Sequence, residues 1–541
     1  MAGAAEAAGQ REEEVPPQRV RLVIGASSVG TVFEWYDFFI YGTLAASGII
    51  GRTFFPAGNE TLQTLLAWAG FAVGFGFRPL GAILFGYMGD KLGRKYTFLV
   101  TITLMGVATA GVGLVPSAET IGLVAPAIII LLRILQGLAL GGEYGGAAIY
   151  VAEHSPPGKS GFYTSFVQAS VAGGFVLSLA VVLGVKAGMS DAAWNDWGWR
   201  VPFLLSLLLL AISLWMRIKL AESPVFRALK EAGETTANPF KESFTYPGNL
   251  KRLFVALFGI AAGLTVIWYT AMFSTLSFLQ GPMRIDQTTA QIIVGIGALG
   301  GLGWFVLFGR LSDRVGRKMP IVIGYALTLV LLFPLFKLMG SAANPDLAAV
   351  AARAPVTIER EACDFDPFAE RQGDLCGQVM GELARLGVPY SFAGDPPAPA
   401  AVEALTVRVG AARAELRDPA EVQPLLEAAG YSFERVVPGP RSIAIILFAI
   451  LALTCLSGAT YGPVAALLSE MFPPKIRYSS MSIPYHFGTG YFGGFLPFIA
   501  SYIVATSGDP YSGLWYTWGV VAMALVVTLF WLPGGKGEPL R

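Results

Sequence analysis

The chain has 541 residues, of which 54% are hydrophobic and 14% are charged; its net charge is +1 and its mean hydropathy is +0.58. A soluble protein of this length needs a far more polar surface, so the composition excludes one and places the chain in a lipid bilayer. The near-neutral charge identifies no partner, and no cluster of basic and aromatic residues suggests nucleic acid.

Apolar runs long enough to cross a bilayer as helices recur twelve times along the chain. Many of the 65 glycines and 34 prolines lie inside them, where they permit close approach and kinks between packed membrane helices. We therefore expect an all-α membrane protein with twelve transmembrane helices in two six-helix bundles. The runs cover, in chain order, residues 22–50, 65–88, 96–115, 121–151, 162–185, 201–216, 253–280, 291–308, 319–339, 443–468, 481–504 and 514–532.

The loops between these runs predict the orientation. Even-numbered connections hold far more Lys and Arg than odd-numbered ones, so both termini should be cytoplasmic. Residues 1–20 lack the apolar core of a cleavable signal. The expected segments are a cytoplasmic tail (1–20), a first bundle (21–218), a cytoplasmic linker (219–250), the second bundle (251–340 and 442–532), an extracytoplasmic insert within it (341–441) and a short cytoplasmic tail (533–541).

One charged motif occurs twice, as GYMGDKLGRK at residues 86–95 and GRLSDRVGRK at residues 309–318. Its aspartates, Asp90 and Asp313, are 313 − 90 = 223 positions apart. A second matching pair, Glu153 and Glu470, is 470 − 153 = 317 positions apart, which indicates one unit used twice with an insertion in the second copy. An aspartate at such a turn can pair with a basic residue or a helix N-terminus only while that face is shut. The candidate gating residues are Gly86, Asp90, Gly93, Arg94, Asp313, Gly316 and Arg317.

The insert at 341–441 differs from the rest in having no Lys and many Ala, Pro, Asp and Glu residues. Its length favours a small folded cap over a bare loop, and an amphipathic helix is expected around Cys376–Leu386. Cys363 and Cys376 could form a disulfide in an oxidising compartment, with two free thiols as the alternative.

Two carboxylates lie within the first apolar run. On a helix Glu34, Asp37 and Tyr41 share one stripe with Ser27 and Gly30. Ionisable groups inside a bilayer are costly and therefore indicate function, so this stripe is expected to line an aqueous path. A structural polar contact between helices is the alternative.

Other ionisable residues lie in the second and fourth runs. Arg78 requires an anionic partner, either a carboxylate of the first helix or a substrate carboxylate. Arg133, Gln136 and Glu143 lie near one face of the fourth helix. A carboxylate beside an arginine can alternate between ion-paired and protonated states, as proton coupling requires.

The sequence offers no enzyme site. His154 and His486 are far apart, and the chain has no metal-ligand cluster, phosphate-binding loop or nucleophile turn. We therefore expect no catalysis, no metal and no cofactor, so that an ion gradient would have to supply the energy for uphill transport.

The paired motifs and the two sets of six helices resemble the major facilitator superfamily. Further matches are similar to its metabolite:proton symporter family, whose members carry α-ketoglutarate, citrate, shikimate, or proline and betaine. These matches are FEWYD at 33–37, FRPLG at 77–81, LQG at 135–137, GGE at 141–143, WGWRVPF at 197–203, ESPVF at 222–226 and EMFPP at 470–474.

The resemblance implies proton-coupled uptake of a small organic acid or zwitterion by alternating access, in a monomer of the bacterial inner membrane. The partners would be the substrate, protons and the bilayer. An uncoupled facilitator or exporter, and a nutrient sensor built on a transporter fold, are the alternatives. Substrate and proton handling would fall to Glu34, Asp37, Tyr41, Arg78, Arg133, Gln136 and Glu143.

Overall fold

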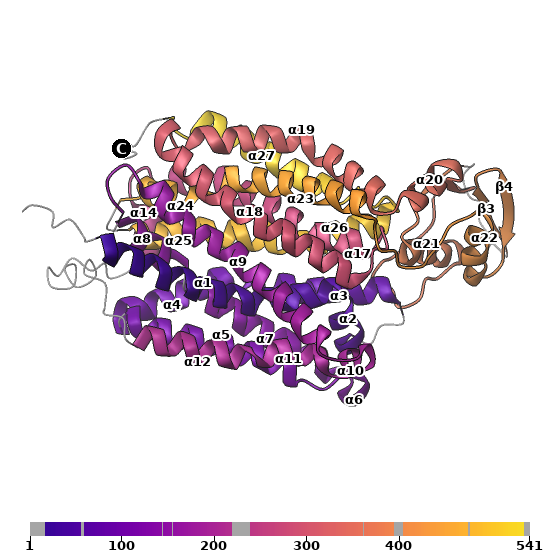
Figure 1. Cartoon of the computed structure of the whole chain (residues 1–541), viewed down its shortest axis with the longest axis horizontal. Helices are drawn as coiled ribbons and strands as arrows, with labels where there is room; N and C mark the ends of the chain where they lie inside the picture. The colour runs from indigo at the N-terminus through magenta and orange to yellow at the C-terminus, as the bar shows by residue number, and fades with distance from the viewer. Residues whose placement is uncertain are drawn as a thin grey trace, which may run out of the picture.

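The computed structural model describes residues 17–55, 59–92, 94–142, 144–153, 155–218, 239–360, 362–393, 404–473 and 476–534. Long helices run side by side along one axis, and a small mixed domain caps one end of the bundle (Figure 1).

The first half supplies six membrane traverses, three of them broken by short interruptions. They are α1 (Pro17–Ala46), α3 with α4 (Glu60–Gly76, Arg78–Leu92), α5 (Arg94–Leu114), α7 with α8 (Val124–Gly141, Tyr144–Glu153), α9 (Ser160–Ala187) and α11 with α12 (Val201–Leu204, Ser206–Ile218). Short helices near the capped end are α2 (Ile49–Phe54), α6 (Ala118–Ile121), α10 (Asp191–Asp196) and η2 (Gly198–Arg200).

The second half repeats this plan, but its first and fifth traverses contain wider π-helical turns. The first combines α15 (Asn249–Phe254), η3 (Val255–Ala261), α16 (Ala262–Tyr269), η4 (Thr270–Ser274) and α17 (Thr275–Gln280), after a short α14 (Pro239–Thr245). The others are α18 (Gln287–Val315), α19 (Lys318–Ala343), α23 with α24 (Pro440–Tyr461, Val464–Met471), α25 with η6 and α26 (Arg477–Phe487, Gly488–Gly494, Leu496–Ser507) and α27 (Leu514–Trp531).

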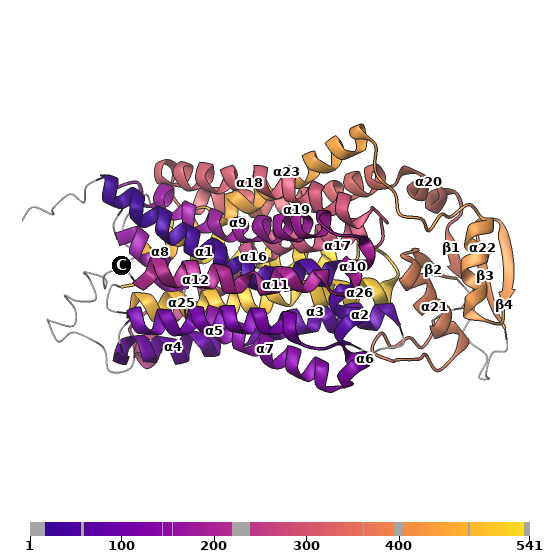
Figure 2. The same cartoon turned by 60° about the horizontal axis from the view of Figure 1, so that its bottom comes forward.

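The predicted all-α membrane fold is confirmed. In the described chain, 10 helices are long and apolar enough to cross a membrane, and α1 and α5 run alongside them to complete twelve traverses (Figure 2). The two halves meet where α9 packs against α18 and where α3 and α4 pack against η6 and α25.

Glycines set the spacing between the second and fourth traverses. A Cβ added at Gly137 would collide with the carbonyl oxygen of Gly74, and one at Gly141 with the carbonyl oxygen of Arg78. The two helices therefore pack backbone to backbone, which only residues without a side chain allow.

The insert folds as a cap with its own core (Figure 1). A four-stranded sheet, in the order β2-β1-β3-β4, packs against the helices. The sequence predicted α21 (Leu375–Leu386), which begins at the capping residue Asp374 and ends at Gly387, a glycine with φ 68°. The other elements were not predicted: α20 (Pro345–Arg353), β1 (Val356–Ile358), β2 (Tyr390–Phe392), β3 (Leu405–Val409), β4 (Ala412–Leu416), η5 (Pro419–Glu421) and α22 (Val422–Ala428).

A disulfide in the structure joins Cys363 to Cys376, whose Cα atoms are 5.5 Å apart. Cys376 belongs to α21 and is buried in the core of the cap. The bridge therefore ties the loop before α21 to the helix that borders the membrane bundles.

Candidate functional site

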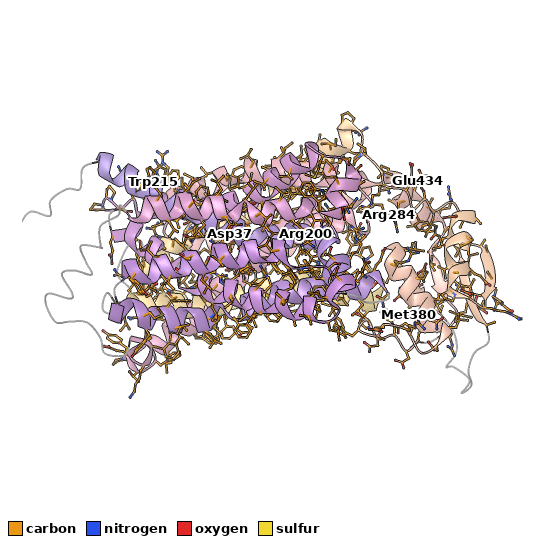
Figure 3. The ribbon with its side chains drawn as sticks, turned by 90° about the horizontal axis from the view of Figure 1, so that it is seen from below. Asp37, Arg200, Trp215, Arg284, Met380 and Glu434 are labelled. Carbon is orange, nitrogen blue, oxygen red and sulfur yellow. A yellow bond between two sulfur atoms is a disulfide. The ribbon has the colours of Figure 1, made fainter. Side chains whose placement is uncertain are left out.

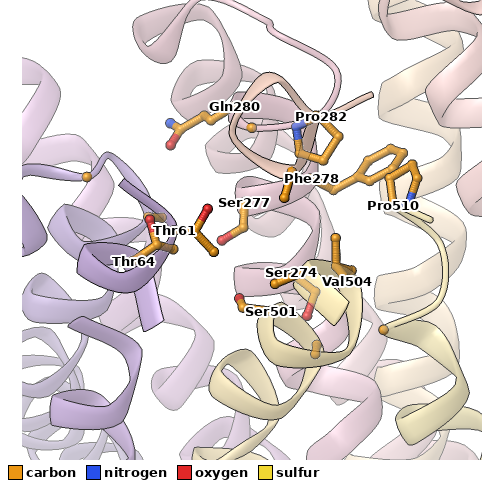
Figure 4. Close-up of a pocket in the computed structure, with 18 of the residues that line it drawn as sticks. Thr61, Thr64, Ser274, Ser277, Phe278, Gln280, Pro282, Ser501, Val504 and Pro510 are labelled. Atoms are coloured by element: carbon orange, nitrogen blue, oxygen red, sulfur yellow. The ribbon is translucent and has the colours of Figure 1, made fainter. Parts of the chain in front are cut away.

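A cavity of about 520 Å³ lies between the two halves at the capped end. Its walls come from α3 in the first half, from η4, α17 and α26 in the second half, and from the cap (Figure 4). This volume is in the range of small-molecule sites, so the cavity can hold a metabolite.

Hydroxyl groups make up much of the polar wall, and they come from both halves of the protein. Thr61 and Thr64 project from α3, whereas Ser274, Ser277 and Ser501 project from the second half (Figure 4). These groups can both donate and accept hydrogen bonds, so a ligand could bridge the two halves.

Three polar side-chain atoms of the seventh traverse have no hydrogen-bond partner in the described part of the chain. They are the buried hydroxyls of Ser274 and Ser277 and the buried Oε1 of Gln280. Leaving such groups unpaired costs free energy, about 1–3 kcal/mol each, which a bound ligand could recover. Ser274 ends the π-helical segment η4, and π-helical turns are frequent at functional sites.

Aromatic rings close the floor of the cavity. Trp68 lines the cavity and also contacts Phe71 and Phe273, with ring centroids 5.5 and 6.0 Å away. Behind it, Phe39 of the first half stacks on Trp268 of the second half at 5.0 Å. The rings pack across the boundary between the halves and separate the cavity from the polar groups deeper in the protein.

Arg133, Gln136 and Tyr41 lie beneath this floor and are fully buried. Arg133 donates to Oε1 of Gln136 at 2.8 Å, and its guanidinium lies 4.4 Å from the Tyr41 ring centroid. The Tyr41 hydroxyl donates to the carbonyl of Ala67. These contacts join helices within the first half, so Tyr41 does not line the aqueous path predicted for its stripe.

Arg78 is also fully buried, but it reaches across to the second half. Its Nη1 donates to the Thr489 hydroxyl in η6 at 3.2 Å, and its guanidinium lies 5.1 Å from the Trp35 ring and 5.2 Å from the Phe75 ring. Arg78 therefore couples the two halves in this conformation and lies outside the large cavity.

Glu34 and Asp37 are buried and border a different space. They line a crevice of about 10 Å³ between α1, α5 and α12, together with Met105 and Ser213 (Asp37, Figure 3). This volume holds about one water molecule, so the crevice is too small for a metabolite. Glu143, predicted beside Gln136, lies outside the described residues.

At the end opposite the cap, the second copy of the repeated motif bridges the two halves. Asp313 lies near the end of α18, and its two carboxylate oxygens accept hydrogen bonds from the backbone N–H groups of Gly161 and Phe162, each at 2.8 Å. These N–H groups begin α9 of the first half, where a helix lacks internal acceptors and attracts negative charge. Asp313 thus caps a helix of the opposite bundle.

Arg317 adds further contacts to this bridge. Its guanidinium donates to Asp313 at 2.7 Å, to Ser160 at 2.7 Å and to both carboxylate oxygens of Glu470 at 2.8 and 3.2 Å. Burial lowers the pKa of Arg317, but its hydrogen bonds and charge interactions with Glu470 and Asp313 outweigh that effect and raise it. The group stays charged and links α9 of the first half to α18 and α24 of the second.

A second ion pair crosses the boundary nearby, between Arg477 and Glu153 at 3.1 Å. Gly316 has φ 92°, a conformation that favours glycine at this turn. In the first copy of the motif, Gly93 lies outside the described residues. The described part of the structure also leaves out the side chains of Asp90 and Arg94 and the surroundings of Gly86.

The family model described as Sugar (and other) transporter matches residues 22–245 and 433–541, more than half of the chain. The chain belongs to this family. Among its relatives, the glycine betaine/proline/ectoine/pipecolic acid transporter OusA of Dickeya dadantii is 37% identical over 332 residues, which are 60% of this chain and 65% of that protein. The shikimate transporter of Escherichia coli is 37% identical over 324 residues, 59% of this chain and 72% of that protein.

A relative that aligns over nearly its whole length is the inner membrane metabolite transport protein YhjE of Escherichia coli, 29% identical with 98% of each chain covered. The solved proton:xylose symporter XylE is 15% identical, with a TM-score of 0.59 over 96% of this chain and 97% of that one. The likeness to XylE shows a major facilitator fold. Together these comparisons confirm the resemblance inferred from the sequence motifs.

Sequence reasoning missed the groups that line the cavity. Ser274 and Ser277 are three positions apart in an apolar run, a spacing that places them on one side of a helix and could have marked them. Glu470 was recognised as a repeat partner of Glu153, but its bond to Arg317 had no sequence signal because 153 positions separate the two residues.

Proposed function

We propose that this family member is a proton-coupled importer of a small organic acid or zwitterion that works by alternating access. The observation that carries the proposal is the asymmetry of the space between the two halves. A cavity of about 520 Å³ exists at the capped end, whereas Asp313, Arg317 and Glu470 bridge the halves at the other end. A carrier needs such a state, in which one end is closed while a ligand site is formed at the other.

The excess of Lys and Arg in the even-numbered loops predicts that the bridged end faces the cytoplasm and the cap lies on the outer side. In that orientation the cavity would receive substrate from outside. Substrate would bind between the hydroxyl groups of α3, α17 and α26, and the bridges around Arg317 would break when the protein opens inwards.

Proton handling would fall to Asp37 and Glu34, because their crevice fits water but not substrate. A buried carboxylate is costly when charged, so a proton bound there on one side of the membrane and released on the other could drive the cycle. Substrate and proton would then occupy separate sites on either side of α1.

The test has two steps. Purified protein is screened by thermal shift against α-ketoglutarate, citrate, shikimate, proline and glycine betaine, because a bound ligand raises the melting temperature by mass action. The ligand that stabilises is then followed into proteoliposomes with an imposed proton gradient. Asp37→Asn should abolish accumulation while leaving exchange across the membrane intact, whereas accumulation by Asp37→Asn without any change would refute the proton role.

A further inference from the structure

The mouth of the cavity carries an excess of positive charge. Four guanidinium groups, those of Arg52, Arg284, Arg385 and Arg435, line it among the described residues, against one carboxylate, that of Glu60. Arg385 and Arg435 belong to the cap. The insert therefore contributes charge to the site as well as covering it.

Two of these arginines fasten the cap to the second bundle in opposite directions. Arg284 follows α17 and donates to the cap carbonyls of Leu386 at 2.8 Å and Phe433 at 3.0 Å (Figure 3). Arg435 of the cap donates to the bundle carbonyls of Gln280 at 3.1 Å and Ile285 at 3.3 Å. Carbonyl oxygens fix the position of a guanidinium but do not neutralise its charge.

The backbone at Arg284 supports a functional placement. Its φ of 54° makes it the one non-glycine residue with positive φ in the described part of the chain. This conformation is unfavourable for a bulky residue, and such backbone strain gathers at functional sites. Its Nε is buried without a hydrogen-bond partner and so keeps a donor unused.

The charges of the neighbouring arginines affect the pKa of Arg284. Burial lowers the pKa of the Arg284 guanidinium, and the neighbouring charges of Arg435 and Arg385 lower it further, while Glu60 opposes them. Arg385 also pairs with Glu382 on the same helix, so its charge is partly offset, whereas Arg284 and Arg435 are held by neutral groups. The sum at the mouth is positive.

We propose that the cap forms an anion-selecting vestibule, in which Arg435 and Arg385 with Arg284 and Arg52 concentrate organic anions above the hydroxyl-lined cavity. Low-dielectric walls strengthen such a field, and it raises the local concentration of ligands of opposite sign. The inference rests on the proposed transport function. It favours carboxylates with a net negative charge over zwitterions as the substrate class.

The test measures the potential directly and needs no knowledge of the substrate. A single reactive cysteine is placed in the cavity wall as Ser501→Cys in a Cys455→Ser background, with the cap disulfide retained. Its modification rates with the anionic reagent methanethiosulfonate ethylsulfonate and the cationic reagent methanethiosulfonate ethyltrimethylammonium are compared with those of free β-mercaptoethanol. The anionic reagent should be favoured by about tenfold or more at low salt, and high salt should remove most of this preference.

Arg435→Gln and Arg385→Gln, made separately, should each reduce the preference by about twofold, because each removes one of three net positive charges that together give about tenfold. Arg385→Gln is informative even if loss of Arg435 loosens the cap, because Arg385 makes no bond to the bundle in the described structure. The matched control is Arg408→Gln, which removes the same charge from the exposed face of β3 and should leave the ratio unchanged.

A ratio equal to that of the free thiol, or equal effects of Arg385→Gln and Arg408→Gln, would overturn the vestibule. These outcomes are independent of transport. A strong anionic preference in a protein that accumulates none of the tested metabolites would leave the vestibule in place and count against the proposed function alone.

Discussion

Neutralising Asp313 should release the closed end of the protein. In Asp313→Asn the side chain keeps its shape but loses its charge, and an amide has one acceptor oxygen where the carboxylate has two. At least one of the two 2.8 Å bonds to the start of α9 is lost, together with the 2.7 Å ion pair to Arg317. Each charged hydrogen bond contributes about 1.5–3 kcal/mol, so the closed end should lose roughly 3 kcal/mol, or about 100-fold in the conformational equilibrium.

The assay follows the distance between the two halves at this end. Spin labels at Lys159→Cys before α9 and Arg310→Cys on α18 are both exposed and lie on opposite sides of the boundary. Pulsed electron resonance should show one short distance in the parent protein and an added longer population in Asp313→Asn. Glu470 should behave similarly, because Glu470→Gln removes the charge that holds Arg317.

Asp286→Asn provides the matched control. Asp286 also caps a helix, accepting from the backbone N–H of Thr289 at 2.9 Å, but that helix is its own α18. Its loss should lower the melting temperature without changing the distance distribution. If Asp313→Asn also lowers only the melting temperature, Asp313 is a helix cap without a role in closure and the reasoning fails.

Three further substitutions test the packing of helices at Gly137, the ring contacts of Arg78 and the disulfide of the cap. Gly137→Ala should lower the free energy of unfolding by about 1–3 kcal/mol or more, because the added methyl group forces apart the backbones of the second and fourth traverses. Gly184→Ala, with open space around it, should be neutral or slightly stabilising in the same melting assay. Equal effects of the two substitutions would exclude backbone contact as the cause. Arg78→Lys keeps the charge but loses the planar stacking on Trp35 and Phe75, so the free energy of unfolding should fall by about 1 kcal/mol. The ligand-induced thermal shift should persist. Loss of that shift would show that Arg78 contributes to substrate binding. Cys363→Ser removes a disulfide that stabilises the cap by roughly 3 kcal/mol, so limited proteolysis should cut the cap faster while transport continues. In the parent protein, thiol labelling without reduction should reach Cys455 alone. Labelling of Cys363 and Cys376 would refute the bridge.

The sequence by itself determined the membrane architecture. Spanning a bilayer imposes a minimum apolar length on each helix, so the twelve traverses could be read from composition along the chain. The second copy of the repeated motif marked a turn that bridges the two halves, because Asp313 and Arg317 act within four positions of one another. The helix at Leu375–Leu386 was also predictable, since its capping residue and amphipathic pattern are local features.

Tertiary structure alone decided which polar residues face the cavity. Helical spacing puts Glu34, Asp37 and Tyr41 on one stripe, but a stripe can face water, another helix or a side crevice, and only the packing of neighbouring helices selects among them. The Tyr41 hydroxyl donates to a carbonyl of α3, and Asp37 lines a crevice beside α5. Ser274 and Ser277, which are inconspicuous in an apolar run, line the cavity. Partners such as Asp313 with the start of α9 depend on how two separately folded halves dock, a relation between distant segments that no local pattern of residues encodes.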